Sequence, residues 1–511
     1  MARYAAIDIG SNSVRMEAAE VLPGQPTRIL ASDREVTRLG ESVFRAGAVS
    51  EEALKNTCAV LTRMSELYHR LDVVGVRAVA TSAIRDTRNQ KEFLARASEA
   101  ISSPVEIISG REEARLIHLG VESSWPQTGR RVIIIDIGGG SAEIIAAEDG
   151  HLREAYSKPL GAVRLRESFL ADEPPSARQL HQMHEYIQEK LWSAVRRLGH
   201  TGWDRAIATS ASASAVASAV ARVPRSKRDD IDRLRVTTAQ VRNLYQKLAQ
   251  LNLAGRRKIT GIGPRRAEII VPGIAVLLDF LQEFHLPAVY YSSAGVRDGI
   301  IADLAARNVG AELSRLSRDQ RREVEDMGRR YGVSLERARR VANIAAQIFT
   351  ALQPLHQLPP ATGKLLEAAA YLLDVGHYVS SMGHHKHSYY VVSNSDMPGF
   401  TESERMLIAA LCRYHRKSLP SPMHSAFQSL SPEEKRVLTL LIPLLRLADN
   451  LERSHEQRIQ SVDCRLNGSG EVMLQVHSSG NIDLEQWAAE RAADVFRQTY
   501  NRPVSVTKAR A

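Results

Sequence analysis

Cysteines are few in this sequence and long apolar runs are absent, and each absence excludes a class of protein. Only three of the 511 residues are cysteines. Cys58, Cys412 and Cys464 lie far apart without metal-ligand spacing, which argues against disulfides and zinc–cysteine sites. No apolar run approaches the ~20 residues of a membrane-spanning helix, and Asp8 interrupts the first apolar stretch, unlike in a signal peptide. We therefore expect a cytoplasmic protein without a membrane partner.

Aromatic residues are also scarce, whereas positive charge is in excess. Aromatics make up 5% of the residues, and the formal net charge is +10. Such a charge favours polyanionic partners, among them nucleic acid, nucleotides and polyphosphate. Because the aromatics are not interleaved with basic residues, no platform for base stacking is evident. Nucleic acid is therefore disfavoured, but charge alone does not identify the polyanion.

The chain is too long for a single hydrophobic core, and its patterning changes near Gly310. Before this point apolar strands alternate with helices, and after it helical periodicity continues to about Leu451. The tail alternates like a hairpin around Asn467. This predicts an α/β region, an all-α region and a small α+β region. Within the first, we expect helices at 51–71 and from 110, a strand near 160–165, and then helices to about residue 222.

One motif occurs twice in the α/β region. An apolar strand delivers Asp8 into a Gly/Ser/Asn turn, and a second delivers Asp136 into three glycines at 138–140, which indicates an internal duplication. Glycine lets backbone N–H groups approach a phosphate, and a carboxylate at a strand end can hold Mg²⁺. One such turn alone would be read as a plain β-hairpin. Two in equivalent places favour opposing phosphate cradles.

Two carboxylates, Glu112 and Glu113, begin the helix expected from Gly110, between Arg111 and Arg115. A carboxylate here can activate water beside anion-binding arginines, and such a base accelerates attack by roughly 10²–10⁴-fold. Acidic residues in a first helical turn also complement the helix dipole. The residues alone leave both interpretations open.

Five segments in this order closely resemble the exopolyphosphatase / guanosine pentaphosphate phosphohydrolase family: 6–13, 79–85, 108–117, 135–143 and 160–164. The resemblance implies a duplicated actin-like ATPase (ribonuclease H-like) α/β fold. In its length and its helical second half, the chain resembles the long bacterial form of exopolyphosphatase. This further resemblance implies an all-α HD-like domain and a small C-terminal α+β domain. The expected boundaries are 1–124 and 125–306 for the two actin-like subdomains, 307–456 for the HD-like domain and 457–511 for the last domain.

The resemblance also implies roles for individual residues. Glu113 would deprotonate the attacking water, and Mg²⁺ or another divalent cation would be held by Asp8, Asp136 and Glu143. The residues implied around the terminal phosphates are Ser11, Asn12, Ser13, Thr81, Arg85, Gly138, Gly139 and Ser141. A lone arginine such as Arg85 is usually a solvated charge, but its motif position favours a phosphate clamp. Arg297 stands where the family closes its second half, and we expect it to pack.

The implied activity is processive exopolyphosphatase action on inorganic polyphosphate by a homodimer. The first alternative is removal of the 5′-terminal phosphate of guanosine pentaphosphate (pppGpp). A second is a non-catalytic regulator that binds polyphosphate or guanosine penta- or tetraphosphate. A kinase is conceivable from the fold, but fold alone does not establish activity.

Two segments depart from the family pattern. A glycine-containing turn late in the second half corresponds to Ala208–Ser212, which has no glycine. Alanine does not readily take a positive φ, so part of the second anion site is in doubt, and this keeps the regulator alternative open.

The helical region lacks the His-Asp pair of an HD metal site. Leu373-Asp374 stands in its place, and residues 337–340 contain no histidine, so a two-metal centre would lack a core ligand. We expect no second catalytic centre, although His384, His385, His387, His415 and Asp449 remain. Instead the region would form dimer contacts, a solvated face or a basic polyanion channel, the last from His387, Arg413, His415, Arg416 and Lys417.

Overall fold

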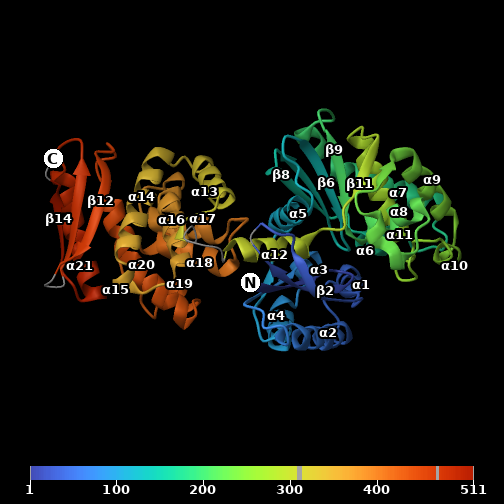
Figure 1. Cartoon of the computed structure of the whole chain (residues 1–511), viewed down its shortest axis with the longest axis horizontal. Helices are drawn as coiled ribbons and strands as arrows, with labels where there is room; N and C mark the ends of the chain where they lie inside the picture. The colour runs from blue at the N-terminus through green and yellow to red at the C-terminus, as the bar shows by residue number, and fades with distance from the viewer. Residues whose placement is uncertain (1, 23, 308–313, 468–470, 510–511) are drawn as a thin grey trace. The chain divides into compact units, whose positions relative to one another are not determined.

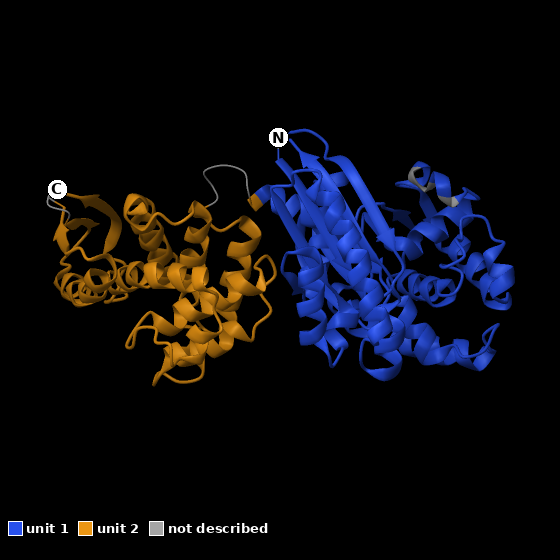
Figure 2. Ribbon diagram, turned by 90° about the horizontal axis from the view of Figure 1, so that it is seen from below, with its two compact units in different colours: residues 1–306 blue, residues 307–511 orange. Residues whose placement is uncertain are grey.

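The structure is a computed structural model that describes residues 2–22, 24–307, 314–467 and 471–509. The chain divides into two units, residues 1–306 and 307–511 (Figure 1; Figure 2). The change in patterning expected near Gly310 falls at this division. The finer boundaries at 124/125 and 456/457 stay predictions.

The first sheet of unit 1 has five strands in the order β3-β2-β1-β4-β5. Strand β1 runs antiparallel to β2 and parallel to β4, and its last residues are Asp8 and Ile9. The strand bounds are β1 Ala2–Ile9, β2 Val14–Val21, β3 Arg28–Glu35, β4 Gly75–Ala80 and β5 Val105–Ile107. The hairpin register places Asp8 opposite Arg15.

The second sheet repeats this arrangement, in the order β10-β11-β9-β6-β7-β8. Its strand β6 runs antiparallel to β7 and parallel to β9, as β1 does to β2 and β4. The bounds are β6 Arg131–Ile137, β7 Ala142–Glu148, β8 His151–Lys158, β9 Arg205–Thr209, β10 Arg235–Thr237 and β11 Ala288–Tyr291. The duplication inferred from the strands that end near Asp8 and Asp136 is therefore confirmed.

Helices cover the two sheets, and α7, α8, α9 and α11 share a core with the second sheet (Figure 1). The first half contains α1 Leu39–Ala46, α2 Glu51–His69, α3 Ser82–Asp86, α4 Gln90–Ile101 and α5 Gly110–Ser124. The second contains α6 Ala162–Phe169, α7 Ala177–Leu198, α8 Ser210–Ala221, η1 Arg225–Ile231, α9 Thr238–Gln250, α10 Leu253–Arg257, α11 Ile270–Glu283 and α12 Val296–Arg307.

Two sequence predictions in this region are wrong. The strand expected near 160–165 is instead the start of α6, because the N–H groups of Ala162 and Val163 bond to the carbonyls of Gly138 and Gly139, at 3.0 and 2.9 Å. A tertiary contact with the glycine turn thus decides the local conformation. In addition, β9 lies inside the stretch expected to be helical up to residue 222.

Helix α5 lies between the two sheets of unit 1. Its Leu116 packs in a cluster with the first sheet, whereas Ala114 and Ile117 pack with the second. Helix α12 crosses it closely, since a Cβ at Gly299 would lie 1.8 Å from the carbonyl oxygen of Leu116. Packing on both faces fixes the N-terminus of α5, and with it Glu113.

Unit 2 has one hydrophobic core shared by helices and a three-stranded sheet in the order β12-β13-β14. Its helices are α13 Arg318–Arg330, α14 Leu335–Ala351, α15 Gln353–His356, η3 Pro360–Thr362, α16 Gly363–Leu372, η4 Val375–Tyr378, α17 His384–Ser393, α18 Glu402–Tyr414, α19 Ser425–Gln428, α20 Pro432–Asn450 and α21 Asp483–Tyr500. The strands are β12 Ile459–Leu466, β13 Val472–Ser478 and β14 Val504–Lys508.

The expected C-terminal hairpin is confirmed by the antiparallel pairing of β12 with β13, although residues 468–470 of its turn lie outside the described residues. Among the described helices, none combines the length and apolarity needed to cross a bilayer.

Candidate active site

A cleft of about 970 Å³ in unit 1 is lined by the turns that follow β1 and β6. Most residues implied by the family resemblance lie in its wall: Asp8, Ser11, Asn12, Ser13, Thr81, Glu113, Asp136, Gly138, Gly139 and Ser141. Arg85 and Glu143 are not among the lining residues, but Arg85 contacts Glu113 and Glu143 lies opposite Asp136 in the β6–β7 hairpin. The structure therefore brings together segments from both halves of the duplication.

The two turns have the same hydrogen bond. The N–H of Gly10 donates to the carbonyl of Ser13 at 3.1 Å, and the N–H of Gly138 donates to that of Ser141 at 3.0 Å. Both turns are tight β-hairpins, as the simplest interpretation of each sequence motif predicts. A plain hairpin does not, however, account for the position of both turns in the wall of the same cleft.

The glycine turn packs directly against the first turn. A Cβ at Gly140 would lie 2.6 Å from the hydroxyl oxygens of Ser11 and Ser82, and one at Gly139 would lie 3.1 Å from the backbone nitrogen of Asn12. Larger residues would push the halves apart. The glycines thus set the spacing of the two halves at the cleft.

Glu113 lies in the first turn of α5, where Ser109 caps the helix by accepting a hydrogen bond from the Glu112 N–H at 3.1 Å. Its side chain is buried, and Arg85 Nη1 donates to Glu113 Oε2 at 2.9 Å and to the Ile108 carbonyl at 2.7 Å. Burial raises the pKa of the Glu113 carboxyl, and Arg85 only partly opposes this rise. Arg85 thus orients a carboxylate whose charge is incompletely balanced.

Three further carboxylates lie near Glu113, and the pKa of each is raised. Burial raises the pKa of Asp8. Burial and repulsion from Glu113 raise the pKa of Asp136 to about 7, and burial with repulsion from Glu113 and Asp136 raises that of Glu143 well above its usual value. Glu143 Oε1 accepts a hydrogen bond from the Ser157 hydroxyl at 2.7 Å. Its buried Oε2 has no hydrogen-bond partner among the described residues.

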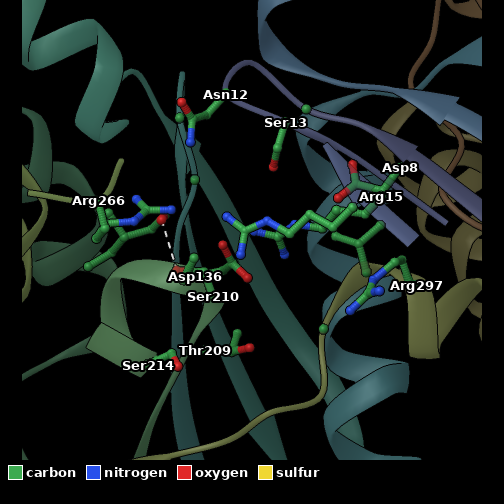
Figure 3. A pocket seen from close by; sticks show the side chains of 18 of the residues that line it. Asp8, Asn12, Ser13, Arg15, Asp136, Thr209, Ser210, Ser214, Arg266 and Arg297 are labelled. Atoms are coloured by element: carbon green, nitrogen blue, oxygen red, sulfur yellow. Dashed lines mark hydrogen bonds between the residues drawn. The ribbon is translucent and has the colours of Figure 1, made fainter. Parts of the chain in front are cut away.

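Arginines line the cleft at positions that sequence reasoning missed: Arg15, Arg34, Arg265 and Arg266. Figure 3 shows Arg15 extending across the cleft toward the carboxylate of Asp136. Its place in the hairpin, opposite Asp8, is a signal that the sequence carried. Arg297, expected to pack, also lines the cleft and forms an ion pair with Glu17 at 3.4 Å.

The glycine-free turn lies across the cleft from Asn12 and Ser13 (Figure 3). The residue with a positive φ in this turn is Ser210, whose φ is 81°. Ala208, by contrast, lies within the buried strand β9. The Ser210 hydroxyl donates to the Ile137 carbonyl at 2.9 Å. A serine thus takes the positive φ that glycine favours. The expectation that an alanine of this turn would have to take it is therefore wrong.

Comparison with known proteins supports the family resemblance found in the sequence. The profile of the Ppx/GppA phosphatase family matches residues 18–308, and that of Ppx/GppA phosphatase domain III matches residues 320–487. A Ppx/GppA family member from Aquifex aeolicus is 28% identical, with 60% of this chain and 99% of that chain covered and a TM-score of 0.53.

Two further structures are similar. An exopolyphosphatase-like protein has 25% identity and a TM-score of 0.56, with 60% of this chain and 98% of that one covered. An exopolyphosphatase from Cytophaga hutchinsonii, at 23% identity over 60% of this chain and 98% of that one, shares the fold with a TM-score of 0.55. The α/β fold of unit 1 is thus the actin-like fold that the resemblance implied. The profile match covers more than half of the sequence, and the chain belongs to the Ppx/GppA phosphatase family, a family of hydrolases that act on phosphoanhydrides.

Proposed function

We propose that this enzyme releases the terminal phosphate of inorganic polyphosphate, by attack of a water molecule that Glu113 deprotonates. The observation that carries the proposal is the position of Glu113. This buried carboxylate of raised pKa shares a cleft with two glycine- and serine-containing turns and several arginines.

Glu113 suits the part of a general base. Its raised pKa makes it a stronger proton acceptor near neutral pH than an exposed glutamate. Arg85 holds one carboxylate oxygen at 2.9 Å, which restricts the side chain to one orientation. We expect the water to lie between the carboxylate and the terminal phosphorus, in line with the leaving oxygen.

The phosphate chain would be bound by backbone N–H groups and serine hydroxyls of the turns at 10–13 and 138–141. Arg15, Arg34 and Arg266 would neutralise its charge, because guanidinium groups match phosphate oxygens in geometry. Donors fixed before the substrate arrives stabilise the charge that develops during transfer. The assignment of Arg85 as a phosphate clamp stays a prediction, since Arg85 contacts Glu113.

Asp8, Asp136 and Glu143 would hold Mg²⁺ or another divalent cation. The residues fit such an ion, because these buried carboxylates have raised pKa values and Glu143 Oε2 has no hydrogen-bond partner among the described residues. Hard carboxylate oxygens are the ligands that Mg²⁺ prefers. A bound ion would neutralise charge on the phosphoryl oxygens.

The lining of the cleft supports the proposal of polyphosphate over a nucleotide. Its wall contains several arginines, whereas Tyr291 is the one aromatic side chain among the described lining residues, so a stacked base finds little support. The volume of about 970 Å³ nevertheless accommodates a nucleotide, and this keeps pppGpp as the second candidate. A homodimer and a polyanion channel in unit 2 stay predictions.

The test is phosphate release from long-chain polyphosphate and from pppGpp, each with Mg²⁺, by wild-type enzyme and Glu113→Gln. We expect a higher kcat/KM on polyphosphate and a loss of at least about 100-fold in the variant. Preference for pppGpp would replace the proposal with the second candidate. Tight binding of polyphosphate without turnover of either compound would leave a regulator.

A further inference from the structure

Four side chains that the proposed reaction does not use converge in unit 2. His377 lies in η4, His384 begins α17, His415 follows α18, and Asp374 precedes η4. We propose that these residues bind one Zn²⁺ or a chemically similar first-row transition-metal ion, in a structural site separate from the carboxylate cluster of the cleft.

The distances suit a single ion. Ligand atoms of Asp374, His377 and His384 all lie within 4.8 Å of one another. His384 Nε2 is 3.3 Å from His415 Nε2 and 4.0 Å from Asp374 Oδ1, and His377 Nε2 is 3.7 Å from the same oxygen. Two nitrogens bound to tetrahedral Zn²⁺ at about 2.0–2.1 Å each are about 3.3–3.4 Å apart. The rings of His377 and His384 are stacked, with centroids 3.9 Å apart, so His377 would have to rotate out of the stack to direct a nitrogen at the ion.

A hydrogen bond prepares one imidazole, that of His415, for this role. His415 Nδ1 donates to the Cys412 carbonyl at 2.8 Å, which leaves the lone pair of Nε2 directed at His384. His384 Nδ1 lies 3.4 Å from both the Ser381 carbonyl and Arg416 Nη1, and the contact with the carbonyl, to which the ring would donate, is the one that presents its Nε2 to a metal. Such bonds to the second ring nitrogen are typical of metal-binding histidines. The two facing Nε2 atoms would then be bridged by the ion.

Arg337 limits the site to one ion. Its guanidinium bonds to Asp374 Oδ2 at 2.5 Å and to Asp449 Oδ1 at 2.6 Å. A fixed positive charge thus lies between the two aspartates, where a second cation would otherwise balance them. This leaves Oδ1 as the oxygen of Asp374 that can bind the ion together with the histidines. The site that we propose therefore holds a single, non-catalytic ion.

Burial distinguishes the cluster from a basic surface. His384 and His415 are 4% and 3% exposed, so His415 does not line a surface channel, contrary to the sequence interpretation. Imidazole nitrogens with one carboxylate form a ligand set typical of Zn²⁺, whereas the cleft offers carboxylates, which suit Mg²⁺. The two sites therefore differ in the ions that they should select.

The experiment uses the full chain, stripped with a chelator, incubated with Zn²⁺, desalted and assayed for metal content. We expect wild-type protein to retain about one equivalent more than His384→Gln and His415→Gln, which should bind at least about tenfold more weakly. The matched control is His477→Gln in the same unit, where His477 pairs with Asp463 outside the cluster. Equal retention by all four proteins would overturn the proposal, and ions held by the cleft cancel in this comparison.

A second measurement needs no variant and so cannot fail through misfolding. Zinc X-ray absorption of wild-type protein loaded with one equivalent should show scattering from imidazole rings. The cleft carboxylates would give a shell of oxygen alone, and that result would overturn the proposal.

Discussion

Glu112 and Glu113 are consecutive buried carboxylates of α5, but their surroundings shift their pKa values in opposite directions. Glu112 faces a network in which Arg115 Nε lies 2.8 Å and Arg77 Nη2 3.1 Å from its carboxylate, and Asp303 completes the set. Burial alone would raise the pKa of Glu112, but the two arginines lower it below its usual value. Glu113 faces the cleft, where burial raises its pKa and one arginine compensates incompletely.

The comparison indicates which charges maintain the fold and which remain for chemistry. A buried carboxylate with full compensation is held in one state, and removing its partner costs stability. A buried carboxylate whose charge is not fully compensated can accept a proton or a cation at neutral pH. Helix α5 joins the two, since the network that anchors it also fixes the position of Glu113.

The sharpest test replaces each carboxylate by its neutral isostere. Glu113→Gln should lower kcat by about 10²–10⁴-fold because the water loses its base. Glu112→Gln should lower the free energy of unfolding because Arg77 and Arg115 lose a charged partner, while the enzyme that stays folded keeps most of its activity. Phosphate release and urea unfolding measure the two effects. A reversal of these outcomes would break the comparison.

Breaking the network should cost stability. Arg115→Met removes one partner of a buried set, and we expect a loss of about 3–5 kcal/mol in the free energy of unfolding of unit 1, measured by urea denaturation. The matched control is Arg153→Met, which breaks an ion pair with Glu148 in which both side chains are exposed, and it should cost only about 0–1 kcal/mol. Equal losses would show that burial does not set the difference.

The pKa of Asp136, about 7 in the fold against 3.8 ordinarily, predicts a pH dependence. The folded state binds the proton more tightly, so this group stabilises the metal-free protein below pH 4, and the contribution is lost as pH rises to about 7. Relative to Asp136→Asn, wild-type protein should lose on the order of 4 kcal/mol over this window. Urea unfolding with a chelator at several pH values measures it. Parallel pH curves for the two proteins would contradict the assignment.

The helix cap beneath both carboxylates should give the smallest effect. Ser109→Ala removes the acceptor for the Glu112 N–H and should cost about 1 kcal/mol of stability. Ser50→Ala removes the corresponding cap of α2 and should cost about as much. Only the first should also lower phosphate release, because only α5 carries Glu113. Equal activity of both variants would separate the cap from catalysis.

Much of the fold followed from local patterns. The strands at Asp8 and Asp136, the helix from Gly110 and the C-terminal hairpin were predicted correctly because apolar alternation, glycine turns and acidic residues in a first helical turn act over a few residues. The strand expected near 160–165 was wrong because backbone bonds to the glycine turn, far along the chain, made it a helix. The strand at 205–209 was missed because its pairing partners, β6 and β11, are both more than sixty residues away in the sequence.

For the site, residue types and spacing were sufficient to identify the turns and the carboxylates of the cleft as candidates, because phosphate and metal chemistry admits few side chains. The sequence by itself determined this inventory, the duplication and the excess of positive charge. Only the tertiary structure decided which carboxylate is compensated, that Arg15 reaches Asp136, that Ser210 takes the positive φ, and that Arg337 lies between two aspartates. The physical reason is that pKa values and ion pairs depend on burial and on neighbours from distant segments, which a linear pattern does not contain.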